Sequence, residues 1–174
     1  PNFHTGVVDG IRKILAETGR AASDVSFLSH ATTVGTNAVL EEELPTVGLI
    51  TNDGFRDIIE IGDQPRPELY NLQIDKPPSL VPRYLRKEVP GRLDSEGSVL
   101  DPLDEAAVEN AVAELAEEDV ASIAVSMVFS YLNSDHEERI GQIIEDIAPG
   151  MNYALSSNVQ PEIGEYERTI TTTL

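Results

Sequence analysis

The chain has 174 residues, which suits one domain or two small ones. Its 31 acidic residues outnumber its 12 basic residues and give a formal net charge of −19. So large an acidic excess argues against nucleic acid and anionic membranes as partners, because both would repel the chain. The sequence holds no cysteine, which excludes a disulfide framework and any thiolate metal site or nucleophile. No apolar run reaches the length of a membrane span and no signal peptide is visible, so a cytoplasmic location is expected.

The first predicted element is a helix that begins near Thr5. Its apolar residues fall on one face of the helix, and Gly19 is expected to end it as a C′ glycine. These apolar residues are Val7, Val8, Ile11, Ile14 and Leu15.

The stretch from residue 25 to residue 43 is the first candidate for a ligand site. An apolar run at residues 25–28 predicts a strand, a turn rich in hydroxyl groups follows, and residues 37–42 read as the first turns of a helix. At the carboxyl end of a strand in an α/β sheet, such a turn and helix start suit a phosphate or carboxylate. The candidate binding residues are His30, Thr32, Thr33, Thr36 and Asn37. An alternative is that these threonines and the asparagine are ordinary capping residues.

Residues 46–51 predict a second strand, closed by a turn at 52–54, so a βαβ unit with parallel pairing is expected. Residues 55–62 are ambiguous between a short helix and a strand. Residues 63–83 carry five prolines and are interpreted as a crossing between two subdomains.

The second half of the chain predicts a compact α/β subdomain. Residues 84–89 and 98–100 read as a β-hairpin, a helix is expected from Asp101 to about Glu117, and residues 121–129 predict a buried central strand. Residues 134–137 read as a capping box that opens the next helix, and residues 152–156 predict another strand.

The last feature is the run from Glu162 to Thr173, in which carboxylates and threonines surround one arginine. Glu165 and Glu167 are candidates for acid/base work or for holding a divalent cation, and Arg168 is a candidate clamp for a carboxylate or phosphate. The alternative is a solvated, salt-bridged turn that leads into a helix.

Five segments, in order and spanning nearly the whole chain, resemble one known family. Residues 30–41, HATTVGTNAVLE, are similar to the HGTT-x-x-TNALLE segment of the hydantoinase A/5-oxoprolinase family. Residues 49–57 resemble its LIT-x-x-GFRD segment, and residues 66–72 its RP-x-LYDL segment. Residues 130–137 resemble SYLNPxHE, and residues 165–172 resemble EYERTSTT.

The resemblance implies an ATP-dependent enzyme that hydrolyses a small cyclic amide such as a hydantoin or 5-oxoproline, with ATP and Mg²⁺ as cofactors. It implies a partial actin/Hsp70-like (ribonuclease H-like) βαβ half, followed by the small α/β subdomain. A hydantoinase B-like second subunit or domain is the implied partner. In this interpretation, Thr32, Thr33 and Thr36 lie near phosphate, and Glu165 or Glu167 serves as a base or cation residue. The expected layout is an ATPase-like part at 1–62, the crossing at 63–83, a subdomain at 84–157 and a return segment at 158–174.

The chain departs from the family pattern in two ways. The glycine-rich DxGGTFTD phosphate segment is absent, and Ala31 replaces the first glycine of HGTT, which restricts close backbone approach to a ligand. The chain also begins at Pro1 without an initiator methionine, so we expect a fragment of a longer protein that folds but does not turn over alone.

Two alternatives remain open at this stage. One is the ATP-using subunit of an acetone or acetophenone carboxylase, which the same resemblance allows. The other is a non-catalytic module that docks to a second subunit. Metal ligation by histidine is not expected, because His4, His30 and His136 lie far apart in the sequence without ligand spacing.

The charge balance predicts a halophilic protein. Acidic residues are spread over helices that also carry apolar faces, and only three basic residues are lysines. High salt should screen the self-repulsion of such a chain. We therefore expect its melting temperature to rise when sodium chloride is increased from low to molar concentration. A melting curve that does not respond to salt would contradict this interpretation.

Overall fold

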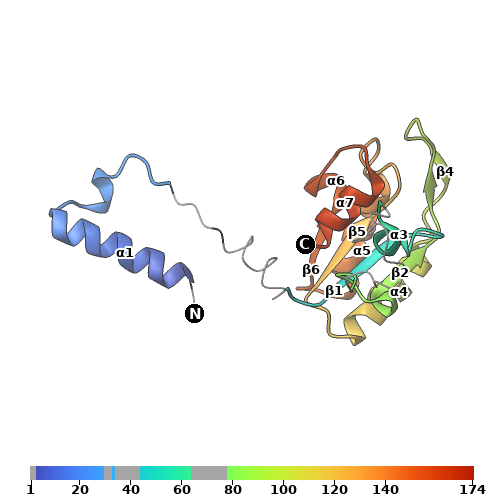
Figure 1. The fold of residues 1–174 in the computed structure, drawn as a ribbon, viewed down its shortest axis with the longest axis horizontal. Helices are drawn as coiled ribbons and strands as arrows, with labels where there is room; N and C mark the ends of the chain where they lie inside the picture. Colours follow the sequence, from blue (N-terminus) through green and yellow to red (C-terminus); the bar gives the residue numbers. More distant parts are fainter. Residues whose placement is uncertain (1–2, 30–32, 34–43, 64–77) are drawn as a thin grey trace, which may run out of the picture. The chain divides into compact units, whose positions relative to one another are not determined.

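The computed structural model describes residues 3–29, 33, 44–63 and 78–174 (Figure 1). The chain forms two compact units, Pro1–Leu40 and Glu41–Leu174. Residues 64–77, which make up most of the predicted proline-rich crossing, lie outside the described residues.

The first unit contains helix α1, Phe3–Thr18, and a short 3₁₀ helix, η1, at Ala22–Asp24. The helix begins earlier than the predicted start at Thr5, but it ends as predicted. Gly19 has φ +64°, which a glycine adopts without strain, and the amide of Arg20 donates to the carbonyl of Leu15 at 3.1 Å.

The predicted strand at residues 25–28 is wrong, because these residues form no strand. A strand needs a neighbour for its backbone groups, and the described residues of this unit include no other strand. The apolar side chains instead line an open groove of about 370 Å³, and Phe27 is 83% exposed. The groove residues are Ile11, Ile14, Leu15, Ala22, Val25 and Leu28.

The second unit is built on a four-stranded parallel sheet with the order β2-β1-β5-β6. Its strands are β1 (Val47–Asn52), β2 (Arg86–Val89), β5 (Ser122–Ser126) and β6 (Asn152–Leu155). All residues of β1 are buried and β5 is nearly so, which explains their continuous apolar sequences. The strands predicted at 46–51, 121–129 and 152–156 are therefore present, the middle one shorter than expected.

Helices pack against this sheet in two groups (Figure 1). Helix α4 (Glu105–Glu117) packs against β2 and against α5 (Asp135–Ile147), which in turn contacts β5 and β6. Helix α7 (Glu165–Thr172) packs on β5 beside the short helices α3 (Ile58–Ile61) and α6 (Ser156–Val159). Residues 55–62, which were ambiguous in the sequence, thus contain a helix.

The core lies between the sheet and these helices. Leucine, isoleucine and valine side chains of the strands and of α4 and α5 make up most of it, and its fully buried members have no measurable exposure. Such burial contributes about 25 cal/mol for each Å² of apolar surface removed from water. The fully buried members are Leu49, Ile50, Val81, Leu85, Val89, Val108, Val112, Leu115, Ile123, Val125, Ile140 and Ile144.

The predicted hairpin between residues 84–89 and 98–100 is wrong in its pairing. Residues Arg83–Leu85 form a 3₁₀ helix, η2, and the following strand β2 pairs in parallel with β1. Pro90 and Gly91 then break the strand, and the hairpin forms between β3 (Arg92–Leu93) and β4 (Val99–Asp101). The buried edge of β1 offers more apolar contact than an exposed hairpin does, because all three residues of β4 are exposed.

Two helix starts also differ from the sequence prediction. Helix α4 is capped by Asp104, whose carboxylate accepts from the amide of Ala107 at 3.0 Å, so Asp101 is not the cap. The predicted capping box at residues 134–137 does not form. Ser134 donates to Glu138 instead, at 2.6 Å, and Glu137 turns into the interior.

His136 gives the fold a predictable dependence on pH. The side chain is buried, its Nδ1 atom has no hydrogen-bond partner among the described residues, and burial lowers the pKa of His136. Because the pKa of His136 is lower in the folded state, the unfolded chain binds a proton more readily. The contribution of His136 to the free energy of unfolding is therefore complete above the pKa of the unfolded chain, about 6.5, and it is lost as the pH falls toward the pKa of the folded state.

We therefore expect His136→Gln to reduce the loss of unfolding free energy between pH 7 and pH 5, as measured by urea unfolding at each pH. The variant and the wild-type chain share every other titrating group, so the difference between their pH slopes isolates this residue. Equal slopes would contradict the assignment.

Candidate functional site

The predicted phosphate-binding residues fall almost entirely outside the described residues. His30, Thr32, Thr36 and Asn37 have no described structure. Thr33 is described as an exposed residue of the first unit. The role of these five residues stays a prediction.

The sheet of the second unit has its own natural place for a ligand, at the carboxyl ends of β1 and β5. From β1 the chain passes to β2 on one side, and it then returns to β5 on the other side. In open parallel sheets, ligands bind where neighbouring strands lead away in opposite directions. At this switch point β1 ends at Asn52 and β5 ends at Ser126.

Three consecutive backbone amides follow β5 at this point, and each donates to a side chain from a different element. The amide of Met127 donates to Glu137 of α5 at 2.8 Å, and that of Val128 donates to Asn52 at 2.6 Å. The amide of Phe129 donates to Glu165 of α7 at 3.3 Å. The segment after β5 is thus held by β1, α5 and α7 together.

Phe129 itself adopts a left-handed backbone conformation, with φ +63°. Such a conformation is costly for a residue other than glycine, and it persists where the surroundings fix it. Here the bond to Glu165 and the edge-to-face contact with Tyr131, with 6.4 Å between the ring centroids, hold it in place. Strained backbone of this kind gathers at functional sites.

Glu137 is a fully buried carboxylate at the centre of the network. Its Oε1 accepts from the hydroxyl of Ser156 at 2.6 Å as well as from Met127, and its Oε2 accepts from the amide of Ser157 at 2.8 Å. A buried carboxylate is tolerated when hydrogen bonds of this kind satisfy it. Glu137 therefore fixes the start of α6 relative to the end of β5.

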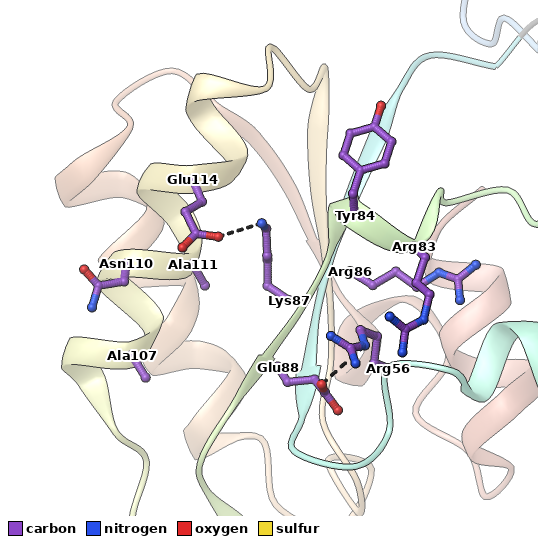
Figure 2. Close-up of a pocket in the computed structure, with 10 residues that line it drawn as sticks. All are labelled: Arg56, Arg83, Tyr84, Arg86, Lys87, Glu88, Ala107, Asn110, Ala111 and Glu114. Atoms are coloured by element: carbon purple, nitrogen blue, oxygen red, sulfur yellow. Dashed lines mark hydrogen bonds and ion pairs between the residues drawn. The ribbon is translucent and has the colours of Figure 1, made fainter.

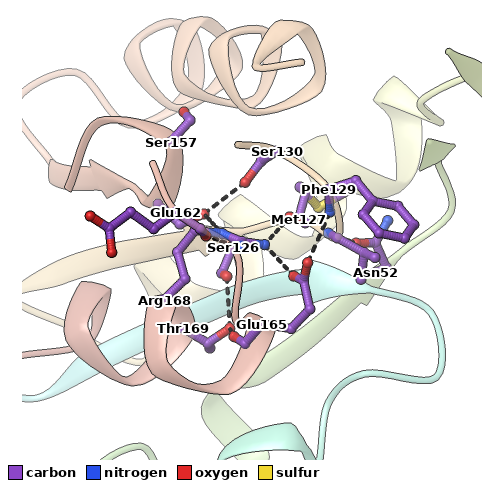
Figure 3. Close-up of polar contacts among 12 residues, drawn as sticks. Asn52, Ser126, Met127, Phe129, Ser130, Ser157, Glu162, Glu165, Arg168 and Thr169 are labelled. Carbon is purple, nitrogen blue, oxygen red and sulfur yellow. Dashed lines mark hydrogen bonds and ion pairs between the residues drawn. The ribbon is translucent and has the colours of Figure 1, made fainter. Parts of the chain in front are cut away.

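Arg168 is the buried cation of the network and has no measurable exposure. Figure 3 shows its contacts. Its Nη2 donates to the carbonyl of Met127 at 3.1 Å and pairs with Glu165. Its Nη1 donates to the carbonyl of Glu162 at 3.0 Å, and its guanidinium lies 5.3 Å from the ring centre of Tyr131.

Ser156 links this cation to the buried anion. Its hydroxyl oxygen accepts from Nε of Arg168 at 3.1 Å, while its single hydrogen goes to Glu137. Ser130, which lies 2.9 Å away from it, must then be the donor in the pair of serine hydroxyls. A continuous chain of hydrogen bonds therefore runs from Glu137 through Ser156 and Arg168 to Glu165.

The predicted catalytic residues are close in sequence but differ in exposure. Arg168 is buried with its donors directed at protein acceptors, and Glu165 is partly buried against it. Glu167 is exposed, and its carboxylate makes no hydrogen bond or ion pair with the described residues. As placed, Glu167 is accessible to a ligand, whereas Arg168 shapes the segment after β5. Their catalytic roles stay a prediction.

Thr169 completes the contact between α7 and the sheet. Its hydroxyl lies 2.7 Å from that of Ser126, at the last residue of β5, and donates to the carbonyl of Glu165 at 2.6 Å (Figure 3). Since Thr169 has one hydroxyl hydrogen, Ser126 is the donor between the two side chains.

Three residues of the network were missed as site residues in the sequence: Asn52, Glu137 and Ser156. For Glu137 a signal exists, because it lies three and seven residues before Ile140 and Ile144 and so falls on the apolar face of α5. For Asn52 the signal is its place directly after a buried strand. Nothing in the sequence marks Ser156.

The described residues offer neither a metal site nor a membrane span. They contain no group of three or more histidine, aspartate or glutamate side chains placed to hold a metal ion. They also contain no helix with the length and apolar character needed to cross a membrane.

Comparison with known proteins identifies relatives along the whole chain. Residues 1–148 match the family model described as the hydantoinase/oxoprolinase N-terminal region. An uncharacterized protein of Methanocaldococcus jannaschii is 38% identical over 91% of this chain and 24% of its own length. The alpha subunit of caprolactamase from Pseudomonas jessenii is 34% identical over 94% of this chain and 24% of its own. The gamma subunit of acetophenone carboxylase from Aromatoleum aromaticum is 34% identical over 86% of this chain and 22% of its own length.

A solved structure shares the fold. The crystal structure of the ATP-dependent caprolactamase from Pseudomonas jessenii superimposes with a TM-score of 0.78 at 34% sequence identity. The match covers 96% of this chain and 25% of that one. The chain therefore spans about a quarter of the length of these relatives.

The network predicts a sharp difference between neighbouring residues of α7. Arg168→Ala removes the partner of Glu165 and takes a donor away from the carbonyls of Met127 and Glu162, so we expect it to lower the free energy of unfolding by about 3–5 kcal/mol. Glu167→Ala removes an exposed side chain and should change it by no more than about 0.5 kcal/mol. Urea unfolding at neutral pH measures both, and similar losses in the two variants would contradict the structural assignment.

Proposed function

Because this chain belongs to the hydantoinase/oxoprolinase family, we propose that it forms part of an ATP-dependent enzyme that opens a cyclic amide. The observation that carries the proposal is the joint agreement in sequence and fold with an ATP-dependent caprolactamase, whose name describes a cyclic-amide hydrolase. ATP would phosphorylate the amide oxygen and leave as ADP; water would then add to the activated carbon, the C–N bond would break with the nitrogen leaving as an amine, and hydrolysis of the acyl phosphate would give the carboxylate and phosphate.

We propose that the scaffold is of the actin/Hsp70 (ribonuclease H-like) type. The proposal of this type rests on the family resemblance; the parallel sheet of the second unit supports only an open α/β scaffold, with a switch point at the carboxyl ends of β1 and β5. At that point the segment after β5 is already held by Glu137, Asn52 and Glu165. The sheet thus offers a rigid wall rather than a flexible loop.

The residues proposed to meet the phosphates are His30, Thr32, Thr33, Thr36 and Asn37. Threonine hydroxyls and backbone amides at a helix start donate to phosphate oxygens, which is the chemistry that phosphoryl transfer requires. The proposal rests on the family pattern at these positions.

We propose different roles for Glu165 and Glu167, the two glutamates in the acidic run of α7. Glu167 has a solvent-facing carboxylate and is suited to act as a base or to meet Mg²⁺. Glu165 pairs with Arg168 and accepts from the amide of Phe129, so it is suited to orient the segment after β5. The described residues place no third carboxylate with these two for a cation, so no step is assigned to Mg²⁺.

We further propose that the protein works with a hydantoinase B-like second subunit, in the cytoplasm. The names of two relatives, an alpha subunit and a gamma subunit, describe those proteins as parts of assemblies. The absence of cysteine and the acidic composition are compatible with a cytoplasmic protein adapted to high salt.

A second candidate function is the ATP-using subunit of a ketone carboxylase. The observation that favours it is the similarity to the acetophenone carboxylase gamma subunit. The chemistry is related, because an enolate oxygen takes the place of the amide oxygen as the phosphoryl acceptor.

The test is ATP hydrolysis by the complete protein that carries this region. ADP release is measured with lactams, hydantoins and 5-oxoproline, and separately with ketones and bicarbonate. We expect a cyclic amide to stimulate ADP release about tenfold or more, and Thr33→Val to abolish most of this stimulation because the hydroxyl donor is lost. Thr18→Val, at another exposed threonine of the same unit, should leave it intact.

Other outcomes distinguish the alternatives. Stimulation by ketones alone would replace the proposal with the carboxylase. Failure to bind ATP together with tight binding to a second subunit would favour the docking module.

A further inference from the structure

A second pocket, of about 710 Å³, lies between strand β2 and helix α4 (Figure 2). Its volume is within the range that small molecules occupy in proteins. It shares no lining residue with the network around Arg168. The pocket therefore needs an explanation of its own.

The lining is unusually rich in cations for this chain. Four of its 12 Lys and Arg residues face the pocket, although the formal net charge of the whole chain is −19. They come from two places in the fold, since one follows β1 and three lie on η2 and β2. The four are Arg56, Arg83, Arg86 and Lys87.

Two of the cations are already occupied. Arg86, whose side chain is 1% exposed, donates to the carbonyl of Val81 and pairs with Asp57 and Glu60. Arg83 makes two hydrogen bonds to Asp57, at 3.1 and 3.2 Å, and these lower the pKa of that carboxyl group. Arg83 and Arg86 thus form the fixed wall of the pocket.

The other two cations keep free donors. The Nε atom of Arg56 is buried without a hydrogen-bond partner but forms an ion pair with Glu88 at 3.4 Å, and the Arg56 side chain is 36% exposed. Its Nη atoms make no hydrogen bond or ion pair with the described residues. Lys87 uses one of its three hydrogens on Glu114, at 2.6 Å, and Glu114 is 61% exposed.

The exposed pair of Lys87 and Glu114 is easily displaced, because surface ion pairs contribute little to stability. An anion that carries more charge than one carboxylate can therefore replace Glu114 at Lys87, in a pocket that Arg56 also lines. The pocket is also lined by Glu88, the amide of Asn110, the ring of Tyr84 and two alanines of α4. Such a wall accommodates the uncharged part of a small molecule.

We propose that this pocket binds a small metabolite that carries a multiply charged oxyanion group, held by Arg56 and Lys87. Guanidinium and ammonium groups are the usual ligands of phosphate and of clustered carboxylates. The rest of the chain repels anions, so a saturable anion site has to be local. Phosphate and carboxylate groups share this chemistry, and the experiment below separates them.

The experiment measures binding of pyrophosphate and of citrate to the chain by calorimetry and by the shift in melting temperature. The sodium concentration is matched with sodium chloride in every sample, because screening alone stabilises so acidic a chain. We expect saturable binding of at least one of the two anions, and the tighter one identifies the oxyanion class.

Three variants and one control test the location. Arg56→Gln and Lys87→Gln should each raise the Kd about tenfold, since each removes a charged donor. Glu114→Gln should lower the Kd, because it frees Lys87 from its competing carboxylate. Arg12→Gln, in an exposed pair with Asp9 on α1, is the matched control and should leave the Kd unchanged.

The opposite effects expected at Lys87 and Glu114 guard against a purely structural explanation. If the two residues only stabilised the fold, both substitutions would act in the same direction on the melting temperature and neither would change binding. Absence of saturable binding at matched sodium overturns the proposal, and so does an unchanged Kd in Arg56→Gln and Lys87→Gln.

Discussion

The second unit depends on how three consecutive amides after β5 are satisfied. The N–H groups of residues 127–129 cannot pair within the sheet once the strand has ended, and an unsatisfied buried donor costs about 1–3 kcal/mol. Glu137, Asn52 and Glu165 accept from them, one from each of three different elements. The end of one strand thus fixes the positions of α5, of the end of β1 and of α7. This requirement also explains why polar side chains lie inside an otherwise apolar core.

The same constraint decides which of the acidic and basic residues near α7 are available for chemistry. A guanidinium that reaches a substrate needs donors that are not already used, and those of Arg168 are directed at Met127, Ser156, Glu162 and Glu165. Its burial gives the segment after β5 a unique shape, since removal of either charge would leave the other uncompensated. Glu167 differs from Arg168, because its carboxylate makes no hydrogen bond or ion pair with the described residues. The network therefore separates residues that hold the site from residues that can act in it.

Much of the second unit could be predicted from its sequence, because its elements follow the apolar pattern. The strands β1, β5 and β6 and the helices α4 and α5 lie close to where the periodicity places them. The errors arise where a choice depends on distant parts of the chain. Residues 86–89 fit a hairpin locally, but β1 offers them a buried partner. Ser134 and Glu137 fit a capping box in the sequence. In the structure, the carboxylate of Glu137 instead accepts a hydrogen bond from the buried amide of Met127, directly after β5. The strand expected at residues 25–28 needs a neighbour, and local sequence cannot show whether one is present.

The positions of the charged side chains in this chain follow the energetic cost of burying each of them. Most acidic side chains lie on the surface, where water solvates them. The halophilic interpretation applies to these surface carboxylates and not to the buried ones. Several cations are placed where they meet a specific anion, as with Arg168 beside Glu165 and Arg86 between Asp57 and Glu60. Arg56 follows this pattern only in part, since its Nε pairs with Glu88 without a hydrogen bond and its Nη atoms meet no acceptor among the described residues. In a chain this poor in cations, a guanidinium that keeps unused donors in a pocket supports the proposed binding of an anion from outside the chain.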